Sequence, residues 1–304
     1  MPELPEVETI ARGLDKRVTG DVIESVWLGS KREPLKSSAA EIVDVLESAR
    51  IVRVRRAGKH IVFDLERGRR TGARGGKKPR KFRQETSRAR AKPVRSGVEA
   101  TPAPMLPGAQ WIVHLGMTGR MVVCGPEQAT EKHTHAIAKL KSGRELRFVD
   151  PRRFGRLSVT RGFLAAGSEP LEIDAQRFVG LFRGRRTPIK SALLNQKLLS
   201  GVGNIYADES LFRAGIRPRR RASSLTRENL RRLHGAVRQV LEEAIALGGS
   251  SVSDYVDADG EEGFFQLQHR VYGREGEPCL VCKTPVKRVV IAGRSSHYCP
   301  QCQK

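Results

Sequence analysis

The chain has 304 residues, 38% of them hydrophobic, so it is long enough for two domains with apolar cores and is not a disordered polypeptide. Its 56 lysines and arginines against 33 acids give a formal net charge of +23, which favours a polyanionic partner, nucleic acid above all. No signal peptide and no run of about 18 apolar residues is present, so we expect a cytoplasmic protein that does not act on membranes.

The N-terminal half reads as one helix followed by strands. Val7, Ile10, Leu14 and Val18 recur at spacings of three and four, which predicts an amphipathic helix. The pattern then alternates along four stretches, at residues 22–29, 51–65, 110–124 and 135–150. We therefore predict an α+β protein whose N-terminal domain, residues 1–165, is an antiparallel β-sandwich with a flanking helix.

A basic insertion interrupts these strands at about residues 67–107. Between Arg67 and Arg95 it holds 13 basic residues and one acid, a net charge of +12, with almost nothing to bury. We predict a disordered insertion. Two interpretations stay open, a solvated loop with no dedicated role and an auxiliary DNA-binding arm.

Helical periodicity returns after Glu172 and predicts a helical domain at residues 166–270. Its helical stretches are expected at residues 189–200, 204–216 and 225–249. Gly201 and Gly203 separate the first two, and Asn204 follows them. Such a turn before a helix can hold a phosphate, although a Gly-x-Gly between helices is more often only a tight turn.

The C-terminal tail, residues 271–304, carries a C-x2-C-x16-C-x2-C pattern. Two closely spaced pairs of thiolates can converge on one Zn2+, and four sulfurs leave no open coordination position, so the zinc would be structural. Two disulfides are the alternative, but cytosolic thiols stay reduced. The expected ligands are Cys279, Cys282, Cys299 and Cys302.

Several short motifs, taken together in their order, resemble one family. They are MPELPEVE at the start, RRAGKH, HLGMTG, DPRRFG, LLNQKLLSGVGNIYADE, and the cysteine tail that ends in RSSHYCPQCQK. The chain is similar in these motifs to bacterial formamidopyrimidine-DNA glycosylases, over nearly its whole length apart from the basic insertion. The resemblance implies a β-sandwich, a helical domain with a helix-two-turns-helix motif, a zinc-finger β-hairpin, and damaged double-stranded DNA bound in a cleft.

The resemblance also implies the roles of individual residues. Pro2 on its own could be a terminal proline without function, but once Met1 is removed it is a secondary amine that can attack a sugar carbon and form an iminium. Glu3 would protonate the ring oxygen of the deoxyribose, which requires a raised pKa, and Glu6 would support it. Lys59 and Arg294 complete the catalytic set, as cations that clamp the phosphates beside the lesion.

The remaining residues implied by the resemblance bind DNA. Asn204 would add a hydrogen bond to the DNA backbone. Met117, Arg152 and Phe154 would fill the space left by a flipped nucleotide, although Met117 and Phe154 taken singly read as core residues. Asn195 departs from the family pattern, which has an acid there, and the departure puts a helix contact in doubt.

The function implied is that of a monomeric, bifunctional DNA glycosylase and AP lyase. It would excise oxidised purines, 8-oxoguanine and formamidopyrimidines, through an N-terminal proline Schiff base followed by β,δ-elimination. Two alternatives remain: an endonuclease VIII-like glycosylase for oxidised pyrimidines, and a non-catalytic DNA-binding protein on the same scaffold. Leu4 and the segment Asp257 to Phe265, which resembles a loop that closes over 8-oxoguanine, favour the purine branch.

Overall fold

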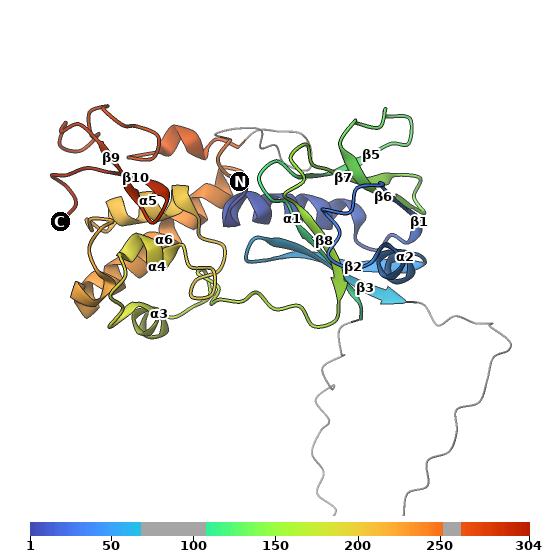
Figure 1. Ribbon diagram of the computed structural model, residues 1–304, viewed down its shortest axis with the longest axis horizontal. Coiled ribbons are helices and arrows are strands. Elements are labelled where there is room, and N and C mark those ends of the chain that lie inside the picture. The colour runs from blue at the N-terminus through green and yellow to red at the C-terminus, as the bar shows by residue number, and fades with distance from the viewer. Residues whose placement is uncertain (68–107, 252–262) are drawn as a thin grey trace, which may run out of the picture.

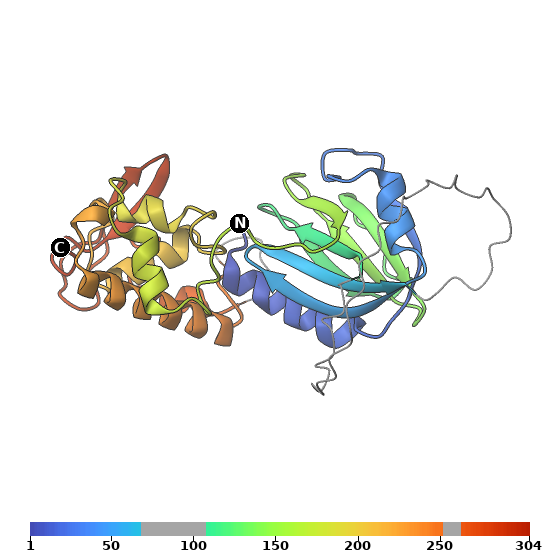
Figure 2. The ribbon, with the colours of Figure 1, turned by 90° about the horizontal axis from the view of Figure 1, so that it is seen from below.

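The computed structural model describes residues 1–67, 108–251 and 263–304. The basic insertion and most of the loop expected to close over a flipped base lie outside these residues. Two bodies, one of strands and one of helices, lie side by side, with the N-terminus at the junction between them (Figures 1 and 2). The predicted fold class, an antiparallel β-sandwich beside a helical domain with a four-cysteine hairpin, is confirmed.

Two four-stranded antiparallel sheets form the sandwich. The first has the order β1 (Ile23–Leu28), β6 (Thr134–Leu140), β7 (Glu145–Val149) and β5 (Arg120–Cys124). The second has the order β2 (Ala49–Ala57), β3 (His60–Arg67), β4 (Gln110–His114) and β8 (Arg156–Thr160). Apolar side chains of both sheets, among them Phe63, Trp111 and Phe148, bury one continuous core.

Helix α1 (Leu4–Val18) connects the two bodies. Its apolar face buries Val7, Ile10 and Leu14 in the core of the sandwich. Leu4, the first residue of the same helix, belongs instead to the core of the helical domain. The residues just before α1 are therefore fixed where the two cores meet.

Among the described residues, the second body has four α-helices, namely α3 (Ala175–Phe182), α4 (Ile189–Leu193), α5 (Asn204–Arg213) and α6 (Arg227–Ala246). The long helix α6 packs against α3, α5 and α1. A short β-hairpin, β9 (Lys287–Ile291) with β10 (Arg294–Tyr298), packs on α5 through β10. In the part of the chain that is described, no helix combines the length and hydropathy needed to cross a membrane.

The structure corrects two of the predicted elements and contains two helices that the sequence did not predict. The helix expected at 189–200 ends at Leu193, because the Asn195 side chain accepts a hydrogen bond from the Lys197 amide at 3.0 Å and turns the chain. The stretch 110–124 forms β4 and β5, which lie in different sheets. Helix α3 and helix α2 (Ala39–Leu46) were not expected.

Candidate active site and DNA interface

The residues around Pro2 form a buried site at the junction of the two bodies. Met1 is 46% exposed, Pro2 is half-buried and Glu3 is 4% exposed. The Glu3 amide donates to the Glu6 carboxylate at 2.8 Å, and Oε1 of Glu3 accepts from the Ile205 amide at 3.2 Å. Oε2 of Glu3 is buried without a hydrogen-bond partner among the described residues, so this carboxyl group has unused capacity.

The turn between α4 and α5 wraps around this N-terminal segment. The Leu4 amide donates to the Gly201 carbonyl at 3.1 Å. A side chain at Gly203 would collide with the carboxyl group of Glu3 and force it to move. The sequence suggested that the amides at the start of α5 could bind a phosphate. One of these amides, that of Ile205, instead donates to the Glu3 carboxylate.

Burial changes the titration of both acids. Loss of solvation raises the pKa of Glu3 to about 7, an effect that the nearby Lys59 opposes and the Glu6 charge reinforces. Burial also raises the pKa of Glu6, whereas hydrogen bonds from the Tyr206 hydroxyl and the Ser250 amide oppose that rise. A carboxyl group with a pKa near 7 can deliver a proton at neutral pH.

Lys59 reaches the site from the turn between β2 and β3. Gly58 makes this turn with a φ of +62°, and a side chain there would collide with Ser200. Lys59 is 8% exposed, and this burial lowers its pKa although Glu3 and Glu6 oppose the effect. The positive charge of Arg294 on the hairpin lowers it further, so the structure brings the predicted residues Glu3, Lys59 and Arg294 into one electrostatic environment.

Two loops of the sandwich present Met117, Arg152 and Phe154. Met117 is 41% and Phe154 52% exposed, so neither is a core residue, and the Arg152 guanidinium lies 5.0 Å from the centre of the Phe154 ring. Buried Asp150 joins the loops, accepting hydrogen bonds from the Thr118 hydroxyl at 2.7 Å and the Gly155 amide at 2.7 Å. The two loops that carry the three exposed side chains are therefore held together by hydrogen bonds to Asp150.

Asn204 and Arg294 are placed by contacts between α5 and the hairpin. The Asn204 side chain donates to the Ser295 hydroxyl at 3.3 Å, beside exposed Arg294. Below them, fully buried Lys190 and Asp208 form an ion pair at 2.7 Å. Lys190 also donates to the Ser295 carbonyl at 2.6 Å, so strand β10 is fixed to the helices by charged groups.

The four predicted metal ligands come together at the base of the hairpin. Their sulfur atoms all lie within 4.8 Å of one another, with 3.4 Å between Cys282 and Cys299 and 3.9 Å between Cys279 and Cys302. These separations exclude disulfides at about 2.0 Å and fit a tetrahedron with Zn–S bonds of about 2.3 Å. The tail holds a structural zinc site, and all four of its ligand positions are cysteines.

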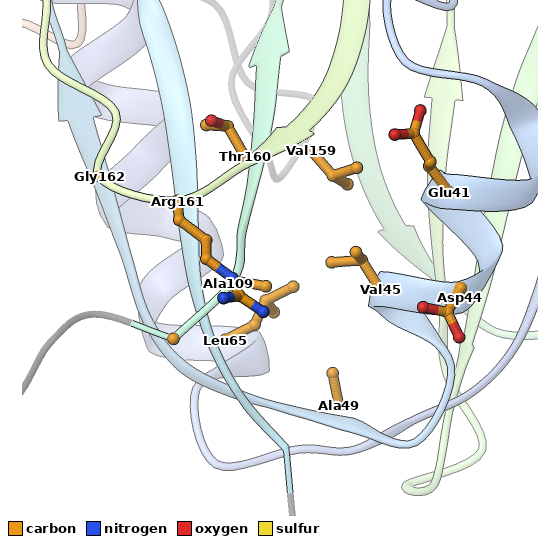
Figure 3. Close-up of a pocket in the computed structure, with 11 residues that line it drawn as sticks. Glu41, Asp44, Val45, Ala49, Leu65, Ala109, Val159, Thr160, Arg161 and Gly162 are labelled. Atoms are coloured by element: carbon orange, nitrogen blue, oxygen red, sulfur yellow. The ribbon is translucent and has the colours of Figure 1, made fainter. Parts of the chain in front are cut away.

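A pocket of about 740 Å³ lies away from this site (Figure 3). Its wall includes Val45 on α2, Leu65 near the end of β3 and Val159 near the end of β8. Lys59 lies just before the first residue of β3, and Phe154 lies just before the first residue of β8, so both are at the other ends of these strands. The pocket therefore lies at the far edge of the sandwich, and none of the predicted site residues lines it.

Sequence reasoning missed Asp150, Tyr206 and Ser250. Asp150 is the first residue of the DPRRFG motif and Tyr206 lies within NIYADE, so both belong to recognised motifs although the sequence assigned them no role. Their contacts explain them, since Tyr206 and Ser250 hold the Glu6 carboxylate and Asp150 holds two loops. Of the three, only Asp150 has a signal in the sequence, because it is an acid at the end of a predicted strand stretch, directly after Val149.

Comparison with known families matches three parts of the chain. The model of the formamidopyrimidine-DNA glycosylase N-terminal domain matches residues 1–157, and that of the H2TH domain of the same enzymes matches residues 166–256. The model of a zinc finger found in FPG and IleRS matches residues 276–304.

Relatives and solved structures agree with these matches. The chain is 40% identical to the formamidopyrimidine-DNA glycosylase of Solibacter usitatus, over all of both chains, and 43% identical to that of Thermus thermophilus, over all of this chain and 98% of the other. The crystal structure of MutM (Fpg) from Thermus thermophilus superposes with a TM-score of 0.78 at 39% identity, covering 99% of this chain and 98% of that one. Lactococcus lactis Fpg in complex with abasic-site DNA gives 0.80 at 29% identity, with 99% of each chain covered. The chain therefore belongs to the formamidopyrimidine-DNA glycosylase family.

Proposed function

We propose that the protein is a bifunctional DNA glycosylase and AP lyase that removes oxidised purines from duplex DNA. The observation that carries the proposal is the buried Glu3 carboxyl group, with a pKa of about 7, directly beside Pro2 and within the electrostatic reach of Lys59. A non-catalytic DNA-binding protein would gain nothing from burying these charges, which costs free energy.

In the proposed reaction, Pro2 is the nucleophile after removal of Met1. Its secondary amine attacks the sugar carbon that bears the damaged base, and the bond to the base breaks. Glu3, protonated near neutral pH, gives its proton to the ring oxygen as the sugar opens. The resulting iminium carries a positive charge without an added proton and acidifies the next carbon, so that elimination of the 3′ and then the 5′ phosphate follows.

The other predicted residues hold the substrate. Lys59 and Arg294 lie close enough for their charges to interact, which suits two cations on the phosphates that flank one nucleotide. Met117 and Phe154, both exposed, can enter the base stack while Arg152 pairs with the orphaned base. A mutant of Lactococcus lactis Fpg has been solved with Fapy-dG DNA, and Lactococcus lactis Fpg has been solved with abasic-site DNA, which supports this class of substrate.

The choice of oxidised purines over pyrimidines depends on the resemblance of Leu4 and of residues 257–265 to the purine branch. Residues 257–262 of that segment lie outside the described residues. The zinc site of the hairpin has four cysteine ligands and no open coordination position, so the hairpin binds DNA and its metal takes no part in the chemistry.

Trapping with borohydride tests the proposal, because the reagent reduces an iminium to a stable covalent link. We expect an adduct on duplexes with 8-oxoguanine, a smaller yield with thymine glycol, and almost none with Pro2→Gly. Mass spectrometry of the adduct should place the link on Pro2. A normal yield from a protein that still carries Met1 would refute the role of Pro2, and a higher yield with thymine glycol would assign the protein to the pyrimidine branch.

A further inference from the structure

Two arginine-rich segments of the helical body lie next to each other. RGRR, residues 183–186, follows α3, and RPRRR, residues 217–221, follows α5. The Ser223 amide donates to the Arg185 carbonyl at 2.7 Å, and Pro188 pairs with Arg221 as an antiparallel bridge. The two segments therefore lie side by side, and we call five of their exposed arginines the arginine ridge: Arg183, Arg185, Arg186, Arg219 and Arg221.

The charge of this ridge is not neutralised by the protein. All five side chains are exposed, and none forms an ion pair with a carboxylate within the described ranges. From Ala175 to Arg227 the only acids are Asp208 and Glu209, both fully buried. Arginines elsewhere often have a carboxylate partner, as Arg213 has Glu243 and Arg120 has Glu131.

Carbonyl oxygens hold parts of the ridge in place. Arg185 donates from Nε to the Leu181 carbonyl at 2.5 Å, and Arg219 donates to the Val290 carbonyl at 3.4 Å. Arg220, which is half-buried and lies between Arg219 and Arg221 in the sequence, donates to the Ser224 carbonyl at 3.0 Å. A carbonyl restrains a guanidinium group without cancelling its charge, so ordering the ridge for an anion costs less side-chain entropy.

The ridge adjoins the DNA-binding hairpin of the proposed function. Val290, which accepts from Arg219, lies on β9 and pairs with Ser295, the residue after Arg294. Arg219 therefore contacts the hairpin at the strand pair next to Arg294. The neighbours of the ridge in sequence, Phe182, Pro218 and Ala222, are buried, so the ridge lacks the apolar anchors typical of protein interfaces.

From these observations we infer that the arginine ridge is a second DNA contact, which binds the phosphates of the duplex outside the lesion site. It recognises charge and not sequence, because guanidinium groups on phosphates carry no base information. The inference rests on the proposed function, since it takes duplex DNA as the substrate. Its role is to lengthen the bound duplex beyond Lys59 and Arg294 and to retain the protein on undamaged DNA.

The test compares two fourfold variants of the full-length, zinc-loaded protein. The first changes Arg185, Arg186, Arg219 and Arg221 to Gln. The control changes Arg50, Arg53, Arg161 and Arg231 to Gln, four arginines that are also exposed and also lack an ion pair among the described residues. Both variants lose the same net charge, so only a localised contact separates them.

Affinity for undamaged duplex is measured against salt concentration, with a duplex several helical turns long and with a short one that ends near the flanking phosphates. On the long duplex, the ridge variant should lower the slope of log affinity against log salt by up to about 3.6, or about 0.9 for each phosphate contact. The control variant, and both variants on the short duplex, should change little.

Equal slopes for the ridge and control variants on the long duplex would overturn the inference and leave an acidic protein as the candidate partner. If the ridge variant lowered the salt slope equally on the short duplex, the inference would also be overturned, because the ridge would then act inside the lesion site. Single-turnover excision from a short damaged duplex should be unchanged in the ridge variant. If the parent protein itself excised no damaged base, the proposed function would be refuted, so a failure of the proposed function can be told apart from a failure of the inference about the ridge.

Discussion

Glu3 shows how burial sets the chemistry of a single residue. Its pKa in the folded protein, about 7, exceeds the ordinary value of 4.5, so the folded state binds this proton more tightly than the unfolded state. The stability from this proton is therefore complete below pH 4.5 and is lost as the pH rises through 7. Above pH 7 the charged, buried carboxylate costs about 3 kcal/mol, at about 1.4 kcal/mol for each pH unit.

We expect Glu3→Gln to remove this dependence. The variant should match the parent protein near pH 4.5 and exceed its free energy of unfolding by up to about 3 kcal/mol above pH 7. It should also lose base excision, since a carboxamide is far too weak an acid to protonate the ring oxygen. Urea denaturation across this pH range provides the measurement, and parallel curves for both proteins would contradict the assignment of the raised pKa to Glu3.

Gly203 offers a second change at the residue scale. Gly203→Ala should lower the excision rate at least tenfold, about 1.4 kcal/mol, because the added methyl group displaces the Glu3 carboxyl group. Gly235→Ala is the matched control, since Gly235 lies within α6 with no atom within 4 Å of the added carbon. The control should keep full activity and gain up to about 1 kcal/mol in stability. Equal activity of the two variants would show that Glu3 is not tightly held.

At the scale of elements, the zinc hairpin should fold only with its metal. Cys299→Ser removes a buried ligand, so we expect loss of zinc, melting of the hairpin and loss of DNA binding. Arg294→Ala should keep zinc and still weaken binding to damaged DNA. Metal analysis together with titration of a fluorescent duplex checks both. Full affinity in a zinc-free Cys299→Ser protein would show that the hairpin does not bind DNA.

The elements that sequence predicted well are those with long periodicity. Helices α1 and α6 repeat apolar residues over several turns, and the four cysteines have a spacing that only a metal site or disulfides explain. Helix α2 has eight residues, too few for a clear period, although Ser38 and Glu41 form the capping box that could have revealed it. The predicted length of helix α4 was too great, because a polar residue such as Asn195 fits the exposed face of a helix and its hydrogen bond to the Lys197 amide cannot be read from the sequence.

At the scale of the whole molecule, the candidate site is a product of distant contacts. Glu3 meets Ile205 and Glu6 meets Ser250, pairs separated by 202 and 244 residues. No local pattern predicts such contacts, so the roles of Glu3 and Lys59 came from family resemblance, and their burial came only from the structure. Arg56 adds a further link, with ion pairs to Glu8 on α1 at 2.7 Å and to Glu169 at the entrance to the helical body at 2.8 Å.

The division of α1 between two cores limits how this protein can be recombined. A fragment that stopped before the helical body would keep Pro2 and Glu3, but it would expose Leu4 to water and lose the Ile205 amide. The carboxyl group of Glu3 would then be solvated, with an ordinary acidity and no proton to donate at neutral pH. The N-terminal half can therefore not be exchanged as a separate module in a gene fusion, since the helical half supplies the buried surroundings that the Glu3 carboxyl group needs.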